Sequence, residues 1–346
     1  MNKPFLSICI PAYENEKSLK QALTSTLGLD NAKIEILISD DSSTNSLQNV
    51  ALDFRHLYPT LNLTYHHQPI NLGVAYNKKW LLENAKGALI LFLEHDDELI
   101  HTETIKSALN LYESNEKIKL FLSNAYISEN GKKRIMQQNL PKTYGNYRNI
   151  SNHYFIKKFL LTSRIRSVSL NWSSVIFEKE AALKAGAFSD LYMMTKCEST
   201  LFSSYHNEEN MIFVLLLANR YELMYTSTPT SIRNLLPRSF SVLNSEINKD
   251  SMINPEYIYL LKIISSVDSY YRKILIIKRL IWIGIPMRND HIFHSNFLDK
   301  RIQRIILYTS LFTGKIYNPL TEPFRSKMIR CYRFLLKLIH NLNKVN

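Results

Sequence analysis

The first hundred residues alternate between short apolar runs and longer segments that carry a helical apolar stripe. The predicted strands are residues 5–10, which are apolar and partly β-branched, 34–38, 61–65 and 88–93. The helical stripes between them are residues 16–29, 47–57 and 75–84. Continuous apolar runs are typical of strands buried on both faces, and strands that alternate with helices indicate right-handed crossovers. The sequence therefore predicts an α/β fold in which helices flank a mixed, mostly parallel sheet.

Polar and turn-forming residues follow three of these predicted strands. The segments are residues 11–14 (PAYE), 40–43 (DDSS) and 94–97 (EHDD). We expect Pro11 to end the first strand. Because ligands bind beyond the carboxyl ends of the strands in open α/β sheets, these three segments predict a binding site on one rim of the sheet.

Carboxylates dominate this predicted rim. Glu94, Asp96 and Asp97 group oxygen ligands that suit a hard divalent cation, which can bridge a diphosphate. The alternative is a solvated acidic turn. Asp40 and Asp41 could cap the next helix or turn through their side chains, or accept hydrogen bonds from a base and a ribose.

The chain beyond residue 145 has a less regular pattern. We expect strands in residues 167–177 and 222–226, a short helix in residues 178–185 and a longer helix in residues 208–219. Glu208 and Glu209 open the longer helix, where negative charge favours the helix dipole, and one of them could instead act as a general base. We expect Arg233 in a loop, either solvated or able to neutralise a leaving diphosphate.

Basic charge is concentrated at the end of the chain. The whole chain has 43 Lys and Arg against 30 Asp and Glu, whereas residues 251–346 have 16 against 5. Helical segments at residues 257–283, 299–312 and 324–342 mix these basic residues with apolar and aromatic ones. This composition predicts a basic helical region that binds an anionic membrane surface, with packing on the rest of the protein as the alternative. No apolar run reaches the roughly 18 residues of a membrane span.

Several motifs in this order resemble the family 2 glycosyltransferases, inverting enzymes with the A-type nucleotide-sugar-binding fold (GT-A). The resemblance extends over about residues 5–241. Its motifs are SICIPAYENE (7–16), ISDDSST (38–44), NLGVAYN (71–77), AKG (85–87), LFLEHDD (91–97), AGAF (185–188), EE (208–209) and IR (232–233), with Ser239 and Ser241. Each fragment alone would recur by chance, but their order and spacing together are specific.

The resemblance implies a role for each matching residue. Donor-binding residues would be Pro11, Ala12, Tyr13, Glu14, Asp40, Asp41, Asn71, Gly73, Asn77, Asp96 and Arg233. Asp41 would meet a uracil-type base, and Asp40 would support its loop. Glu94, Asp96 and Asp97 would hold Mg2+ or Mn2+, with Glu94 replacing the usual first Asp. Glu209 would be the general base, with Glu208 as its close competitor.

The resemblance also implies an organisation and an activity. Residues 1–245 would form the GT-A domain, with a nucleotide-sugar half at about 1–130 and an acceptor half at about 131–245, followed by the basic helical region 246–346. We expect an inverting transfer from a UDP-sugar to a glycan or lipid-linked acceptor in bacterial surface-polysaccharide synthesis, at the cytoplasmic face of the membrane. The alternative is a non-catalytic nucleotide-sugar or membrane-binding module. No motif predicts nucleic-acid binding.

Overall fold

The computed structural model describes residues 5–29, 33–115, 117–136, 142–143, 146–151, 171–184 and 221–235. The chain divides into two units, residues 1–247 and 248–346, and every described residue belongs to the first. Glu208, Glu209 and the expected basic region 246–346 lie outside the described residues. Their predicted roles therefore stay predictions.

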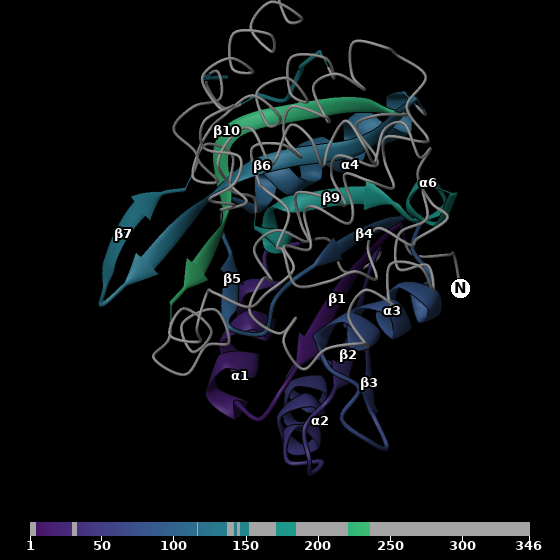
Figure 1. The fold of residues 1–346 in the computed structure, drawn as a ribbon, viewed down its shortest axis with the longest axis vertical. Helices are drawn as coiled ribbons and strands as arrows, with labels where there is room; N and C mark the ends of the chain where they lie inside the picture. The colour runs from purple at the N-terminus through teal and green to yellow at the C-terminus, as the bar shows by residue number, and fades with distance from the viewer. Residues whose placement is uncertain are drawn as a thin grey trace, which may run out of the picture. The chain divides into compact units, whose positions relative to one another are not determined.

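One mixed sheet organises the described residues (Figure 1). Its strands are β1 (Leu6–Ala12), β2 (Ile34–Asp40), β3 (Asn62–His67), β4 (Leu89–Phe92), β5 (Asp97–Leu99), β6 (Ile118–Glu129), β7 (Lys132–Ile135), β8 (Arg148–Asn149), β9 (Val175–Glu178) and β10 (Glu222–Asn234). The order across the sheet is β3-β2-β1-β4-β9-β6-β10-β5, with β7 paired to β6 and β8 to β10. Strands β1 to β4, β6 and β10 run in one direction, and the others run against them. The sheet is thus mixed and mostly parallel, as predicted.

Helices cover the sheet because their apolar stripes are buried against it. The helices are α1 (Glu16–Ser25), α2 (Leu47–Leu57), α3 (Val74–Asn84), α4 (Thr102–Ser114) and α6 (Lys179–Lys184). Asn15 caps α1, since its Oδ1 accepts the backbone N–H of Ser18 at 3.0 Å. Right-handed crossovers place α1 and α2 on one face and α3 on the other, because the chain reverses its direction of travel across the sheet after β3.

Two predicted boundaries are wrong. Strand β1 continues through Pro11 to Ala12. Alternate residues of a strand direct their backbone groups toward the same neighbouring strand, so Pro11, like Cys9, faces β4. Strand β4 pairs with β1 only as far as Cys9. The missing N–H of Pro11 therefore interrupts no ladder. Within the described residues 171–184, residues 172–174 form a 3-10 turn rather than the predicted strand, which is formed by Val175–Glu178.

Strands β6 and β7 form a hairpin that was not predicted from the sequence. Its turn residues Asn130 and Gly131 both have positive φ, 48° and 76°. This is the backbone that a two-residue type I′ turn requires, and Asn-Gly is its preferred sequence. Glu129 and Lys132 pair across the turn. The Asn-Gly pair was the available signal for this hairpin.

Candidate active site

The order of the strands reverses at β1, which lies between β2 and β4. The chain moves from β1 outward to β3, and then returns to the other side of β1 to form β4. Such a switch point opens a crevice at the carboxyl ends of the strands, where ligands bind in open α/β sheets. Residues 13–14 follow β1, Asp41 follows β2, and Glu94 and Asp96 follow β4. The fold therefore brings all three predicted segments to one rim.

Asp41 organises the loop before α3. Its Oδ1 accepts the backbone N–H of Leu72 at 2.6 Å, and its Oδ2 accepts that of Gly73 at 2.8 Å. In return, the Asn71 side chain donates to the Asp41 carbonyl at 2.9 Å. Burial raises the pKa of Asp41, while the two backbone hydrogen bonds lower it. Gly73 has φ +76°, a conformation that side-chain-bearing residues rarely adopt, so this residue type suits the turn into α3.

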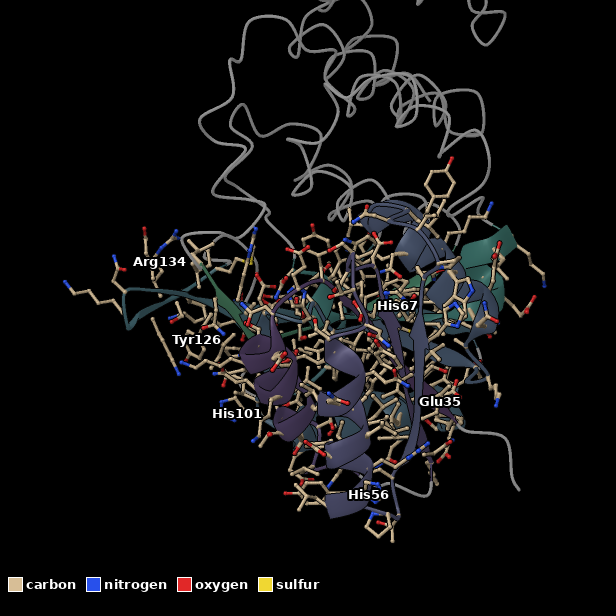
Figure 2. The ribbon with its side chains drawn as sticks, turned by 90° about the horizontal axis from the view of Figure 1, so that it is seen from below. Glu35, His56, His67, His101, Tyr126 and Arg134 are labelled. Atoms are coloured by element: carbon tan, nitrogen blue, oxygen red, sulfur yellow. The ribbon has the colours of Figure 1, made fainter. Side chains whose placement is uncertain are left out.

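Asp40, at the end of β2, is fully buried and hydrogen-bonds to the loop after β2 and to β3. Its Oδ1 accepts the Ser42 backbone N–H at 3.0 Å and the Ser42 hydroxyl, and its Oδ2 accepts the Tyr65 hydroxyl at 2.6 Å. The hydroxyl oxygen of Ser42 in turn accepts the backbone N–H of Glu14 at 2.7 Å. His67 lies against the Ser42 carbonyl at 3.1 Å, at the carboxyl end of β3 (Figure 2). Asp40 therefore supports the loops around the rim.

Glu94 is held in an ion pair. Its Oε1 accepts the Lys78 ammonium, whose side chain is 3% exposed and lies 4.9 Å from the centre of the Trp172 ring. A buried ammonium requires a counter-charge, and Glu94, with 23% of its side chain exposed, supplies it. The Glu94 carboxylate is thus engaged with Lys78 in this structure.

Asp97 is buried at the centre of a polar network. Its Oδ2 accepts the Asn171 amide and the Ser173 hydroxyl, both at 2.7 Å. Ser173 also accepts the backbone N–H of Glu94 at 3.1 Å, and Asn171 donates to Ser231 at 3.2 Å. Burial raises the pKa of Asp97 to about 8, helped by the charge of Asp96 and opposed by the two hydrogen bonds. The network ties the turn after β4 to residues 171–173 and to β10.

Asp96, like Glu94, is partly exposed on the rim. Burial raises its pKa, and the charges of His95 and Arg233 oppose that rise. Arg233 was expected in a loop, but it lies in β10, between Asp97 on β5 and Ile127 on β6. Strand β10 extends to Asn234 because β5 and β6 pair with its carboxyl half. This pairing brings a guanidinium near Asp96.

The structure does not gather Glu94, Asp96 and Asp97 into one ligand set. Among the residues that the structure describes, no three His, Cys, Asp or Glu side chains are grouped as a protein-only metal site requires. A cation bound through one or two carboxylates and the phosphates of its substrate needs no such group. Asp96 fits a cation site shared with substrate phosphates, because it offers carboxylate oxygens on the rim.

The remaining predicted donor-site residues have different environments. Tyr13 is 46% exposed and Glu14 is exposed, whereas Pro11 and Ala12 are buried in β1. Asn77 is buried; its amide donates to the Ser39 carbonyl at 2.9 Å, and among the described residues its Oδ1 has no hydrogen-bond partner. Pro11, Ala12 and Asn77 thus shape the rim from beneath, and Tyr13 and Glu14 form its surface.

Three residues around the site, Lys78, Asn171 and Ser173, were not predicted from the sequence. Lys78 directly follows the NLGVAYN motif, and a lysine on the buried face of a helix signals a partnered charge. Nothing in the local sequence marks Asn171 or Ser173, because their partner Asp97 is more than 70 positions away.

Residues 7–174 match the family model described as Glycosyl transferase family 2. The chain is 26% identical over 165 residues to the Escherichia coli protein named UDP-Glc:alpha-D-GlcNAc-diphosphoundecaprenol beta-1,3-glucosyltransferase WfgD, covering 48% of this chain and 54% of that one. The chain spans about half the length of the curated relatives that it matches, between 31% and 59% for three of them.

Two solved structures share the fold. S. aureus TarS 1-349 in complex with UDP-GlcNAc has a TM-score of 0.57 at 17% identity, covering 88% of this chain and 79% of that one. The mannosyltransferase PcManGT from Pyrobaculum calidifontis, in complex with GDP-Man and Mn2+, has a TM-score of 0.51 at 10% identity, covering 95% and 80%. These similarities confirm the expected GT-A fold, and residues 7–174 are similar to glycosyl transferase family 2.

Proposed function

We propose that this chain is an inverting glycosyltransferase. It moves a sugar from a UDP-sugar to a hydroxyl of a glycan or lipid-linked acceptor in bacterial surface-polysaccharide synthesis. The observation that carries the proposal is the switch point at β1, which brings Asp41 and Asp96 to one rim. The names of the relatives support it, since WfgD is named for UDP-glucose and a diphosphoundecaprenol acceptor and the TarS structure holds UDP-GlcNAc.

The donor's base would bind beside Asp41. The Asp41 carboxylate is already oriented by two backbone N–H groups, so binding a base costs little further ordering. Tyr13, exposed at the end of β1, would cover the base, and Glu14 would lie near the ribose. Asp40 would act only through the loops that it supports.

The diphosphate would lie between Asp96 and Arg233. Asp96 would hold Mn2+ or Mg2+ together with diphosphate oxygens, and the cation would offset the charge of the leaving diphosphate. The Arg233 guanidinium would donate to the diphosphate, since an arginine fork suits phosphate oxygens. Asp97 would position the turn rather than bind the metal, because its side chain is buried and Asn171 and Ser173 engage its Oδ2.

Glu209 would take the proton from the acceptor hydroxyl, and Glu208 is the alternative base. The deprotonated oxygen would attack the anomeric carbon from the face opposite the diphosphate, so the configuration would invert. Residues 1–245 would supply this machinery, and the basic region 246–346 would keep the enzyme at the cytoplasmic face of the membrane.

Sugar transfer from a panel of UDP-sugars to lipid-linked and soluble acceptors, with Mn2+ present, tests the proposal. We expect transfer by the wild type and a loss of kcat of about 10²- to 10⁴-fold in Glu209→Gln, because a general base contributes about that much. The Kd for UDP should not change.

Two controls make the result specific. Glu180→Gln changes an exposed carboxylate on α6 and should keep full activity. Glu208→Gln separates the two candidate bases. Full activity in Glu209→Gln would refute its assignment, and a wild type that binds UDP but transfers no sugar would favour the non-catalytic binding module.

A further inference from the structure

Three consecutive basic residues lie on the β6–β7 hairpin. Lys132, Lys133 and Arg134 form most of β7 and are exposed. Within the described ranges, none of them forms a salt bridge with a carboxylate. Figure 2 shows Arg134 on a hairpin that stands out from the rest of the described fold. Glu129, opposite Lys132 across the turn, offsets part of this charge, so among its described residues the hairpin carries a net positive charge.

This hairpin continues the rim of the candidate active site. Asp97, Arg233, Ile127 and Arg134 are paired in one row across β5, β10, β6 and β7. Since neighbouring strands are about 4.8 Å apart, the row is roughly 15 Å long. Strands β6 and β10 run in the same direction as β1 and β4, so the hairpin projects from the edge that carries Asp41 and Asp96.

The side chains of Lys132, Lys133 and Arg134 are better placed to contact a layer of anionic headgroups than to bind one anion together. Successive residues of a strand point to opposite faces, so Lys133 diverges from Lys132 and Arg134. Diverging side chains cannot converge on one phosphate, but they can meet separate headgroups. The half-buried pair Tyr126 and Ile135 lies across β6 and β7 on the Lys133 face, where an aromatic ring can enter a headgroup layer.

We propose that the β6–β7 hairpin is an electrostatic docking surface for a bilayer that contains anionic phospholipid. The inference rests on the proposed function, because a lipid-linked acceptor is presented at a membrane. The hairpin then holds the rim next to the bilayer in which the acceptor is anchored. Nucleic acid is the less suitable partner, since tight binding to DNA uses about 6 to 10 phosphate contacts and this hairpin offers three basic groups.

Vesicle co-sedimentation of the full chain tests the docking surface without donor or acceptor. The probes are phosphatidylcholine vesicles with and without phosphatidylglycerol, at low and high salt. We expect the variant Lys132→Gln/Lys133→Gln/Arg134→Gln to bind the anionic vesicles about 100-fold more weakly than the wild type. The wild type should prefer anionic vesicles, and salt should weaken its binding.

A matched control removes the same charge elsewhere. Lys20, Arg55 and Lys117 are exposed and lie away from the hairpin, and their triple Gln variant should keep most of the binding. The charge-preserving variant Lys132→Arg/Lys133→Arg should bind like the wild type, which separates loss of charge from misfolding. Equal binding by the hairpin variant and the wild type, or equal losses in both Gln triples, would overturn the proposal. So would wild-type binding to DNA fragments with none to anionic vesicles.

Activity provides an independent readout. Transfer to a short soluble acceptor should be unchanged in the hairpin variant, whereas transfer to a vesicle-embedded acceptor should fall. A reduction of both activities alike would contradict a docking role. A wild type that transfers no sugar, but whose vesicle binding depends on the hairpin, would refute the proposed function and leave the docking surface supported.

Discussion

Asn171 donates its side-chain amide to Asp97 across 2.7 Å, although the two residues are 74 positions apart in the sequence. Both side chains are buried. Replacing Asn171 with Ala should therefore leave the Asp97 carboxyl group without one of its donors and reduce the free energy of unfolding by about 1 to 3 kcal/mol. Urea denaturation measures this loss.

An exposed hydrogen bond from another Asn side chain provides the control. The amide of Asn84 donates to the Trp80 carbonyl at 2.9 Å in an exposed position. The variant Asn84→Ala should cost less than about 0.5 kcal/mol, as is usual for surface substitutions. Equal losses in the two variants would show that the Asp97 network adds no stability of its own.

Protonation of Asp97 should make stability depend on pH. Its pKa is about 8 in the folded protein, against about 3.9 for an unperturbed Asp. Between these values the folded state retains a proton that the unfolded state has released, so the free energy of unfolding falls as pH rises from about 4 to 8. We expect thermal melting to show this fall in the wild type and a smaller fall in Asp97→Asn.

The control for this pH profile is Asp53→Asn, an exposed position on α2. Its slope of melting temperature against pH should match that of the wild type. A slope that is the same in Asp97→Asn and the wild type would mean that Asp97 is ionised in the folded protein at neutral pH.

The parallel half of the sheet could be predicted from the sequence because each of its strands and helices is defined by residues that are close together in the chain. Buried strands such as Leu89–Phe92 are continuous apolar runs, and α1 and α2 carry amphipathic stripes. Gly87 also belongs to a motif recognised in the sequence. The structure explains why glycine is required there, because an added Cβ would lie 2.6 Å from the Ser7 backbone nitrogen. The position of Asp41 at the end of β2 followed from the same local pattern.

The antiparallel half could not be predicted in this way because its strands are defined by distant partners. Arg233 looked like a loop residue, yet pairing with β5 and β6 keeps it in β10. The roles of Asp96 and Asp97 also depend on tertiary contacts. The two carboxylates are adjacent in sequence, but Asn171 and Ser173 engage one of them and leave the other on the rim.

Asp41→Asn should weaken nucleotide binding. Both Asp41 oxygens accept backbone N–H groups, so an Asn amide would direct its own N–H toward one of these donors. The loop before α3 would then lose its hydrogen bond or shift. Because hydrogen bonds to charged groups contribute about 1.5 to 3 kcal/mol, we expect the Kd for UDP to rise by about 10- to 100-fold in titration calorimetry. Asp53→Asn should leave this Kd unchanged, and unaltered UDP binding in Asp41→Asn would contradict the proposed base site.

Lys78 and Glu94 should be energetically coupled. We expect Lys78→Met and Glu94→Gln each to cost about 1 to 3 kcal/mol, and the double variant to cost less than their sum by about 1 kcal/mol or more, because each single change leaves one charge unpaired. The exposed pair Lys33 and Glu113, 3.0 Å apart, provides a matched cycle with Lys33→Met and Glu113→Gln. That cycle should couple by less than about 1 kcal/mol. Coupling no larger than in the surface pair would show that burial does not strengthen the Lys78–Glu94 interaction.

Removal of the metal should separate Asp96 from Asp97. If Asp96 binds the cation with the donor's diphosphate, EDTA should weaken UDP binding by the wild type, and Mn2+ should restore it. In Asp96→Asn, adding Mn2+ should no longer improve UDP binding, because the rim has lost its oxygen ligand. In Asp97→Asn the response to Mn2+ should persist, since Asn171 and Ser173 can still donate to an amide oxygen at that position. Calorimetric titration with and without Mn2+ gives the Kd for UDP of the wild type and both variants. If the effect of Mn2+ disappears in Asp97→Asn but survives in Asp96→Asn, the two roles are reversed.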